Sequence, residues 1–187
     1  FFILNSELIY MASIEIFFGA GIAFFCIITV KIPFLKFAVI FSPSTSEGSV
    51  KRLVKEEVLR CEMLGIKYMV LHPGSHVGQG VDTGIDNIIR GLNEVLENSS
   101  VTILLETMAG KGTEIGRDFS EINRIIAGIK KKELIGVCLD TCHLNDAGYD
   151  ISDFDLLLDQ FDEEVGLSYI KCIHINDSKN DKGAHKD

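Results

Sequence analysis

Four residues of types that bind metal ions recur in this chain at a constant interval. His72, Glu106, Asp140 and His174 lie 34 residues apart, and each one ends a short apolar run. The apolar runs have the length and composition of buried β-strands, and one stretch of helical periodicity separates each run from the next. Strands of this kind, alternating with single helices, indicate a parallel sheet that is buried on both faces. The interval therefore predicts a repeating strand–helix architecture.

The expected elements follow from these two periodicities. We expect strands at 67–72, 101–106, 135–140 and 169–174. We expect helices from the apolar stripes within 50–64, 85–96, 119–129 and 154–165. Ser49 and Gly65 are candidate N-terminal and C-terminal caps of the first helix, because their side-chain types favour those positions. Asp118 and Glu121 have the spacing of a capping box before the third helix.

The four recurring residues are expected to meet in space. Successive right-handed strand–helix units point their strands the same way, so residues that end the strands converge on one rim. Taken singly, a His is usually a surface residue, and a Glu at a strand end can simply cap the next helix. Together, two imidazoles and two carboxylates supply the nitrogen and oxygen ligands that zinc or manganese prefers. We therefore predict a metal site formed by His72, Glu106, Asp140 and His174.

Further polar residues lie near this predicted rim in the sequence. His143 comes three residues after Asp140, and we expect it on a loop from which it reaches a neighbouring metal ion. Residues 110–113 (GKGT) lack the spacing of a phosphate-binding loop, so no nucleotide cofactor is expected, and they are interpreted as a flexible loop above Glu106. Cys142 is expected to be a small buried residue. The other candidates are Asp177 and Asp187 after the fourth strand and, more weakly, His76 and His185.

Composition narrows the class of protein. The net charge of −9 argues against a basic nucleic-acid surface, but carboxylates that hold divalent cations reverse the local field, so a DNA substrate stays open. The five cysteines are odd in number, widely spaced and contain no C-x-x-C pair, so neither a disulfide framework nor a zinc ribbon is indicated. They favour a reducing compartment, so we expect a cytoplasmic protein, or a nuclear or organellar one in a eukaryote.

The first 41 residues differ from the rest. They are apolar and contain no His, Asp, Arg or Gln, whereas residues 42–187 have an ordinary mixed composition that fits one domain. The uncharged run at 16–30 is shorter than the ~20 residues that cross a bilayer, so a membrane span is not favoured. A pair of buried barrel strands and a mistranslated, out-of-frame segment remain alternatives. Because the chain begins with Phe, without a basic segment, we expect no secretory signal and a longer parent chain.

From about residue 65 to residue 187 the chain resembles endonuclease IV, the zinc-dependent apurinic/apyrimidinic endonuclease family of base-excision repair. The resemblance rests on LHPGSH (71–76), LDTCHLNDAGYDI (139–151) and IHINDSKNDKGAHKD (173–187), supported by LLETMAGKGTEIG (104–116). It implies an α/β fold, a (β/α)8 TIM barrel with three zinc ions at its C-terminal rim. About four clear strand–helix units are present, so the barrel is expected to be incomplete in this chain.

The resemblance also implies a role for each site residue. His72 would bind the first zinc, and the catalytic Glu106 would bridge the first and second zinc ions rather than shuttle a proton. Manganese is a possible substitute for zinc. A metal-bound hydroxide would hydrolyse the phosphodiester 5′ to an abasic site in double-stranded DNA. The full-length parent would be a monomer. The remaining implied ligands are Asp140 and His174 for the second zinc, and His143 and Asp187 for the third.

The chain also departs from the family pattern. The family has another metal-binding His on the strand before His72, but residues 1–71 contain none, and a further His and a bridging Glu would fall beyond Asp187. We therefore expect little incision activity from this chain alone. The alternatives are a metal-dependent sugar isomerase or epimerase of the related barrel class, and a non-catalytic metal- or DNA-binding remnant. His143 and Asp187 favour the nuclease, because a third metal has no role in isomerising a sugar.

Overall fold

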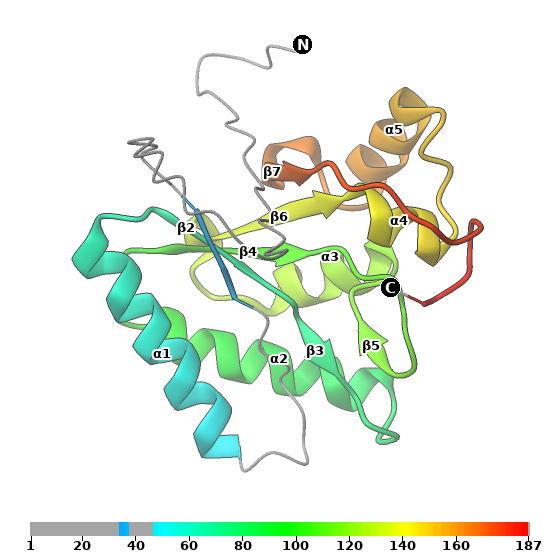
Figure 1. Cartoon of the computed structure of the whole chain (residues 1–187). Coiled ribbons are helices and arrows are strands. Elements are labelled where there is room, and N and C mark those ends of the chain that lie inside the picture. The colour runs from blue at the N-terminus through cyan, green and yellow to red at the C-terminus, as the bar shows by residue number, and fades with distance from the viewer. Residues whose placement is uncertain (1–33, 38–46, 187) are drawn as a thin grey trace, which may run out of the picture.

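A parallel five-stranded sheet lies at the centre of the structure, a computed structural model that describes residues 34–37 and 47–186 (Figure 1). The strand order is β1-β2-β4-β6-β7, so strands that neighbour each other in this sheet also follow one another along the chain. All four strand pairs are parallel. The strands are β1 (Phe34–Phe37), β2 (Tyr68–Leu71), β4 (Thr102–Glu106), β6 (Ile135–Asp140) and β7 (Ile170–His174).

Helices connect these strands, and α1, α2 and α3 lie on the same side of the sheet (Figure 1). A sheet in chain order with helical crossovers on one face is the arrangement of consecutive units of a (β/α)8 barrel. None of the described helices is both long and apolar enough to cross a membrane. The helices are α1 (Glu47–Leu64), α2 (Val81–Leu96), α3 (Phe119–Gly128), α4 (Thr141–Ala147) and α5 (Phe154–Glu164), with 3-10 turns at Lys132–Leu134 and Leu167–Tyr169.

Side chains alternate between the two faces of the sheet, as the pleat of a β-strand requires. The helix-covered face carries one large apolar core, which includes Met69, Ile103 and Val137. The opposite face carries a small separate cluster formed by Val70, Leu104, Cys138 and Cys172. The four recurring residues each follow a member of this small cluster by two positions, so they continue the same face towards the C-terminal rim: His72, Glu106, Asp140 and His174.

The ends of helix α1 test the predicted caps. Gly65 has a φ of +67°, its N–H donates to the Glu62 carbonyl (3.1 Å), and the N–H of Ile66 donates to the Cys61 carbonyl (2.8 Å). The predicted C-terminal cap is therefore confirmed, because a left-handed residue at this position favours glycine. The predicted N-terminal cap is wrong. Helix α1 begins at Glu47, so Ser49 lies inside its first turn.

Helix α3 has half of the predicted capping box. The side chain of Asp118 accepts a hydrogen bond from the Glu121 N–H (3.0 Å), as expected for an N-cap. The Glu121 carboxylate does not return to the Asp118 N–H; it accepts from the backbone N–H groups of Gly116 (2.7 Å) and Arg117 (3.3 Å). Glu121 therefore fixes the chain that enters the helix.

A second sheet, of two short antiparallel strands, was not predicted. Strand β3 (Gly74–Ser75) pairs with β5 (Glu114–Ile115). The Ser75 hydroxyl and the His76 N–H both donate to the Thr113 carbonyl, at 2.9 and 3.0 Å. The end of the GKGT segment is therefore held beside the chain that follows His72; residues 110–113 form a loop between β4 and β5, and their flexibility stays a prediction. Two-residue strands are too short to show alternation in the sequence.

The predicted boundary between residues 41 and 42 falls outside the described residues, and so does the apolar run 16–30. Within the first 41 residues, Phe34–Phe37 form β1, which pairs in parallel with β2. The division into an atypical segment (1–41) and a partial barrel (42–187) stays a prediction.

An aromatic contact joins helices α3 and α5 on the helix-covered face. Phe119 and Phe161 are both fully buried, and their rings meet edge to face with centroids 5.0 Å apart. The Tyr149 ring also stacks on Phe119, with centroids 4.3 Å apart, and its hydroxyl accepts a hydrogen bond from the Phe119 N–H at 3.0 Å. Edge-to-face aromatic pairs add to the burial of their apolar area. This cluster therefore holds the last described helix against the sheet.

We predict that Phe161→Ala lowers the free energy of unfolding by about 3–5 kcal/mol, because it removes a fully buried ring from this cluster. Leu156→Ala on the same helix is the matched control. Leu156 is 51% exposed, so its replacement should change stability by no more than about 0.5 kcal/mol. Urea unfolding followed by circular dichroism measures both, and equal effects of the two substitutions would contradict the packing described.

Candidate metal centre

The centre of the candidate site is the carboxylate of Glu106, the last residue of β4. Its side chain is fully buried, and its two oxygens face imidazoles from two other strand ends. Glu106 Oε2 lies 2.8 Å from His72 Nε2, and Oε1 lies 2.8 Å from His174 Nδ1. Residues separated in sequence by 34 and 68 positions therefore meet on one carboxylate. The predicted convergence of His72, Glu106 and His174 is present in the structure.

His72 enters the site from just beyond its strand. His72 was predicted to be the last residue of its strand. Strand β2 ends at Leu71 instead, so His72 lies one residue past the strand end. Its imidazole packs edge to face against that of His143, with ring centroids 5.7 Å apart. Pro73 and Gly74 follow, and Gly74 has a φ of +136°, a conformation that favours glycine. This turn redirects the chain into β3 and leaves the His72 ring at the rim.

Asp140 is the last residue of β6 and has two tasks. Its Oδ1 caps helix α4 by accepting hydrogen bonds from the N–H groups of Cys142 (2.9 Å) and His143 (3.1 Å). Its Oδ2 accepts from Asn176 Nδ2 (2.5 Å) and lies 3.6 Å from His174 Nδ1. Burial raises the pKa of Asp140, but the hydrogen bond from His174 and the charge of His143 hold the pKa below its ordinary value. The carboxylate is therefore ionised at neutral pH.

His143 lies in the first turn of helix α4, which corrects its predicted place on a loop. The residue is buried, and its Nδ1 donates to the Thr107 carbonyl at 2.7 Å. A carbonyl only accepts, so Nδ1 carries a proton, and Nε2 is the ring nitrogen available to a metal ion. Histidines that ligate metals are typically oriented by such a hydrogen bond from the other ring nitrogen. Nδ1 also lies 4.0 Å from Glu106 Oε1 and 3.9 Å from Asp140 Oδ1.

His174 balances the charge of the two carboxylates. Hydrogen bonding to Asp140, and then to Cys172 and Glu106, raises the pKa of His174 to about 11. A buried carboxylate needs a compensating positive charge close by. In the absence of a metal ion the protonated His174 supplies it, and a divalent cation would replace that proton.

The residues fit a divalent metal ion by their chemistry and by one contact. The ligand atoms of Glu106, Asp140 and His143 all lie within 4.8 Å of one another. His72 Nε2 and Glu106 Oε2, although 2.8 Å apart, are not placed at the angles of a hydrogen bond. Two ligand atoms that face each other in this way suit a shared cation. Imidazole nitrogen and carboxylate oxygen are ligands of zinc and of manganese.

The other candidates from the sequence lie outside this group. Asp177 is exposed, and His76 accepts a hydrogen bond from the Gly80 N–H at 3.3 Å. His185 Nδ1 donates to the Ala109 carbonyl at 2.8 Å. Cys142 is buried, as expected. Asp187 lies outside the described residues, so its role at a third metal stays a prediction.

Asp146 was missed by the sequence analysis, although it organises the chain after β7. It is fully buried, and its carboxylate accepts from Ser178 Oγ (2.6 Å), Asn180 Nδ2 (2.9 Å) and the Lys186 N–H (3.3 Å). Its backbone carbonyl accepts from the His185 N–H at 3.0 Å. Burial raises the pKa of Asp146. The hydrogen bonds that its carboxylate accepts lower the pKa below its ordinary value, and they come from Ser178, Asn145, Asn180 and the backbone of Lys186. Asp146 therefore holds the segment that leads to Asp187.

Two further residues support the site without having been singled out in the sequence. The hydroxyl of Thr107 accepts a hydrogen bond from the Asp140 N–H (2.9 Å), and its backbone carbonyl accepts one from His143 Nδ1. Asn176 donates to Asp140, and the Thr141 hydroxyl donates to the Asn176 carbonyl at 2.6 Å. Thr107 directly follows the end of β4, and Asn176 lies two residues after the end of β7. The only sequence signal that could have identified these two residues is their position just after a strand. That position does not distinguish them from ordinary loop residues.

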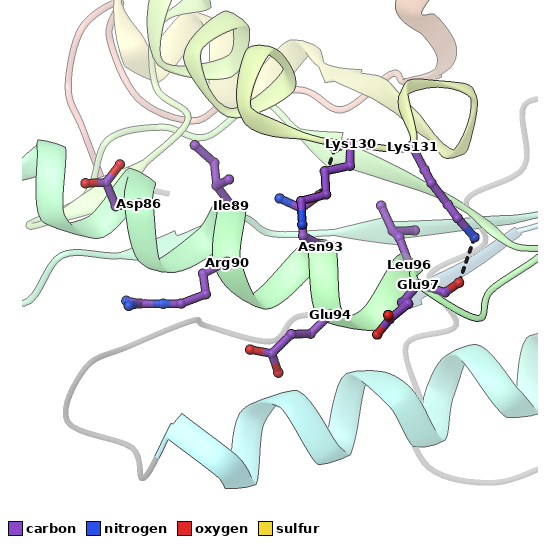
Figure 2. A pocket seen from close by; sticks show the side chains of 9 residues that line it. All are labelled: Asp86, Ile89, Arg90, Asn93, Glu94, Leu96, Glu97, Lys130 and Lys131. Carbon is purple, nitrogen blue, oxygen red and sulfur yellow. Dashed lines mark hydrogen bonds between the residues drawn. The ribbon is translucent and has the colours of Figure 1, made fainter.

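A cavity of about 470 Å³ lies on the outer surface, between α2 and the chain after α3, and is separate from this site (Figure 2). Its walls carry acidic and basic side chains in equal number, so it has no strong preference for a charged ligand. Lys130 N–H donates to Asn93 and Lys131 Nζ donates to the Glu97 carbonyl across it. The charged lining residues are Asp86, Glu94, Glu97, Arg90, Lys130 and Lys131.

Comparison with known proteins places this geometry in a family. Residues 26–187 match the model of the Xylose isomerase-like TIM barrel family. The chain is 56% identical over 147 residues to a protein of Oceanobacillus iheyensis named "Probable endonuclease 4", covering 78% of this chain and 49% of that protein. It is 57% identical over 136 residues to the Staphylococcus aureus protein of the same name, covering 72% and 46%. The chain thus spans about half the length of the curated relatives it matches.

Solved structures agree with the sequence comparison. Endonuclease IV from Thermus thermophilus superposes with a TM-score of 0.68 and 28% identity, covering 81% of this chain and 56% of that one. A zinc-bound IOLI protein superposes with a TM-score of 0.62 over 81% of this chain and 53% of that one. Its 23% identity shows a shared fold only.

The fold and the site together define a TIM-barrel protein with a candidate metal centre at the C-terminal ends of its strands. The chain belongs to the Xylose isomerase-like TIM barrel family. Within that family its sequence is similar to the endonuclease IV proteins, so the resemblance seen in the motifs is confirmed. The predicted fold class, an incomplete (β/α)8 barrel, is confirmed as well.

We predict that Asp146→Asn loosens the segment 178–186. Trypsin should then cleave after Lys179 and Lys182 about tenfold faster or more, because hydrogen bonds to a buried carboxylate contribute roughly 1.5–3 kcal/mol each. Asp150→Asn is the matched control. Asp150 contacts the same segment through an exposed ion pair with Lys182 (3.4 Å), which is worth roughly 0–1 kcal/mol. Equal cleavage rates in the two variants would contradict the role of Asp146.

Proposed function

We propose that this chain supplies the metal centre of a DNA-repair endonuclease that hydrolyses the phosphodiester 5′ to an abasic site in double-stranded DNA. The observation that carries the proposal is the buried Glu106 carboxylate, held between the imidazoles of His72 and His174 beside Asp140 and His143. The high identity to proteins named endonuclease 4 supports the nuclease class. Because the chain spans half of those proteins, the complete activity is proposed for a whole protein of their length.

The residues of the chain have defined tasks in this proposal. Asp140 stays ionised, and its carboxylate and that of Glu106 would retain cations at the rim. His72 and His174 hold the Glu106 carboxylate from two sides, and Thr107 keeps the His143 ring in one orientation. Bound divalent ions, zinc in our proposal, would supply Lewis-acid stabilisation of phosphodiester oxygens and an activated water. Three such ions are proposed for the whole protein, with His143 and Asp187 at the third.

The proposed site also reconciles a DNA substrate with an acidic chain. The net charge is −9, which repels a phosphodiester at long range. At the rim, however, divalent ions held by Glu106 and Asp140 would reverse the sign of the local field. Binding of DNA is therefore proposed to depend on metal, and to weaken when the metal is removed.

The sugar isomerase alternative has weaker support. Structures of epimerases superpose on this chain, for example a D-tagatose 3-epimerase-like protein with a TM-score of 0.59, but at 22% identity. Such a likeness shows the fold alone. Identity to the endonuclease 4 proteins is more than twice as high. We therefore favour the nuclease, and a non-catalytic remnant is an outcome that the experiments below detect.

We predict that Glu106→Gln weakens zinc binding roughly 100-fold or more. Loss of an outer-shell partner typically costs 10–100-fold in metal affinity, and removal of a ligand should cost at least as much. Glu133→Gln, on the 3-10 turn before β6, is the control and should bind zinc as the wild type does. Isothermal titration of the metal-free chain with zinc measures the affinity. Unchanged affinity in Glu106→Gln would remove the basis of the proposal.

We predict that the 187-residue chain nicks a duplex containing one tetrahydrofuran abasic analogue only slowly, compared with an equimolar amount of the Oceanobacillus iheyensis relative. The product should end 5′ to the analogue with a 3′-hydroxyl, and chelation by EDTA should abolish it. The undamaged duplex of the same sequence is the control. Rapid nicking by the chain would contradict the expected shortage of ligands. Nicking that survives EDTA, or that is equal on undamaged DNA, would overturn the proposed function.

A further inference from the structure

Two cysteine thiols lie directly below the carboxylate centre, on the same face of the sheet. Cys138 and Cys172 occupy adjacent strands β6 and β7 and are paired in register. They are 0% and 5% exposed, and they form the small cluster with Val70 and Leu104. His174 follows Cys172 by two residues and so continues the same face. Two buried thiols and one partly exposed imidazole therefore lie together on this face of the sheet.

The spacing of these three side chains suits one metal ion. The ligand atoms of Cys138, Cys172 and His174 all lie within 4.8 Å of one another. A tetrahedral ion with bonds of about 2.3 Å to sulfur separates its ligand atoms by about 3.8 Å, so small side-chain movements are enough to close the site. We propose that Cys138, Cys172 and His174 form a sulfur-containing site for a thiophilic divalent cation such as zinc or cadmium.

Charge balance supports such a site in apolar surroundings. A dication bound to two thiolates and a neutral imidazole has no net charge, and its binding releases the two thiol protons and the His174 imidazolium proton to solvent. A neutral complex avoids the cost of burying an isolated charge beside Val70 and Leu104. Three protein ligands also leave a fourth tetrahedral position open, as in catalytic zinc sites.

The thiol site differs from the carboxylate centre in the metals it selects. Glu106, Asp140 and His143 offer oxygen and nitrogen, which suit zinc and manganese. Thiolates shift the preference towards zinc and softer ions, so manganese is expected to occupy only the carboxylate centre. His174 also contacts the carboxylate centre, because its Nδ1 lies 2.8 Å from Glu106 Oε1 and 3.6 Å from Asp140 Oδ2. One imidazole therefore couples the two sites.

Cobalt(II) distinguishes the two sites by its spectrum. We expect the full metal-free chain, kept reduced and anaerobic, to develop near-ultraviolet thiolate-to-cobalt charge-transfer absorption as cobalt is added. Cys138→Ser and Cys172→Ser should each weaken this absorption, and the double variant should lose it. Cys61→Ser is the matched control, because Cys61 is equally buried but lies in α1 within the other core cluster, and it should keep the full absorption. The readout needs no DNA cleavage, so it is independent of the proposed nuclease activity.

A measurement on the unmodified chain covers the case in which the serine variants do not fold. Cadmium-113 NMR of the wild-type chain should show a resonance in the strongly deshielded range of sulfur-ligated cadmium. Three outcomes would overturn the proposal. They are a cadmium resonance only in the oxygen and nitrogen range, cobalt bound without charge-transfer absorption or not bound at all, and absorption that persists in the folded double variant and so arises from another thiol such as Cys142.

Discussion

The burial of one carboxylate constrains the whole arrangement of strand ends. Glu106 is fully buried at the end of a central strand, and a carboxylate in that position is unfavourable unless positive or hydrogen-bonding groups surround it. His174, at the end of β7, meets this need through its hydrogen bond to Oε1, while His72, just beyond β2, faces Oε2 from the opposite side of β4 in the sheet order. Parallel pairing brings those groups within 3 Å because all the strands end at the same rim. The candidate function therefore depends on the same contact that compensates the buried charge.

A second set of contacts converts strand ends into a rigid site. Asp140 caps helix α4 with one oxygen and faces His174 and Asn176 with the other, so the helix that carries His143 is attached to the ligand beside it. Asp146, on the same helix, holds the chain after β7 through its buried carboxylate. Beneath them, Cys138 and Cys172 form the next layer of the barrel interior. Hard and soft ligands thus occupy successive layers of one face, because side chains two residues apart along a strand lie above one another.

The strand-end residues could be predicted from the sequence because each one follows a short apolar run, and these runs recur at a regular interval. A buried parallel strand is a continuous apolar run, and the polar residue that ends it is visible without a structure. Gly65 was predictable for a similar reason, since a left-handed residue after a helix favours glycine. Ser49 was wrong because its side-chain type is compatible with an N-cap but does not fix where the helix starts. The place of His143 was wrong because seven-residue helix α4 is too short to show an apolar stripe, and the Asp140 cap defines its start.

What the sequence by itself determined is the succession of strands and helices, the residues that end the strands, and through its motifs the endonuclease IV-like character. Those properties are encoded in short segments, so they can be read one segment at a time. Only the tertiary structure decided that Glu106 is the residue on which two imidazoles meet, that Asp146 and Asn176 support the site, and that two cysteines lie beneath it. Each of these depends on strand register and on contacts across more than 30 residues of chain, which no local pattern records.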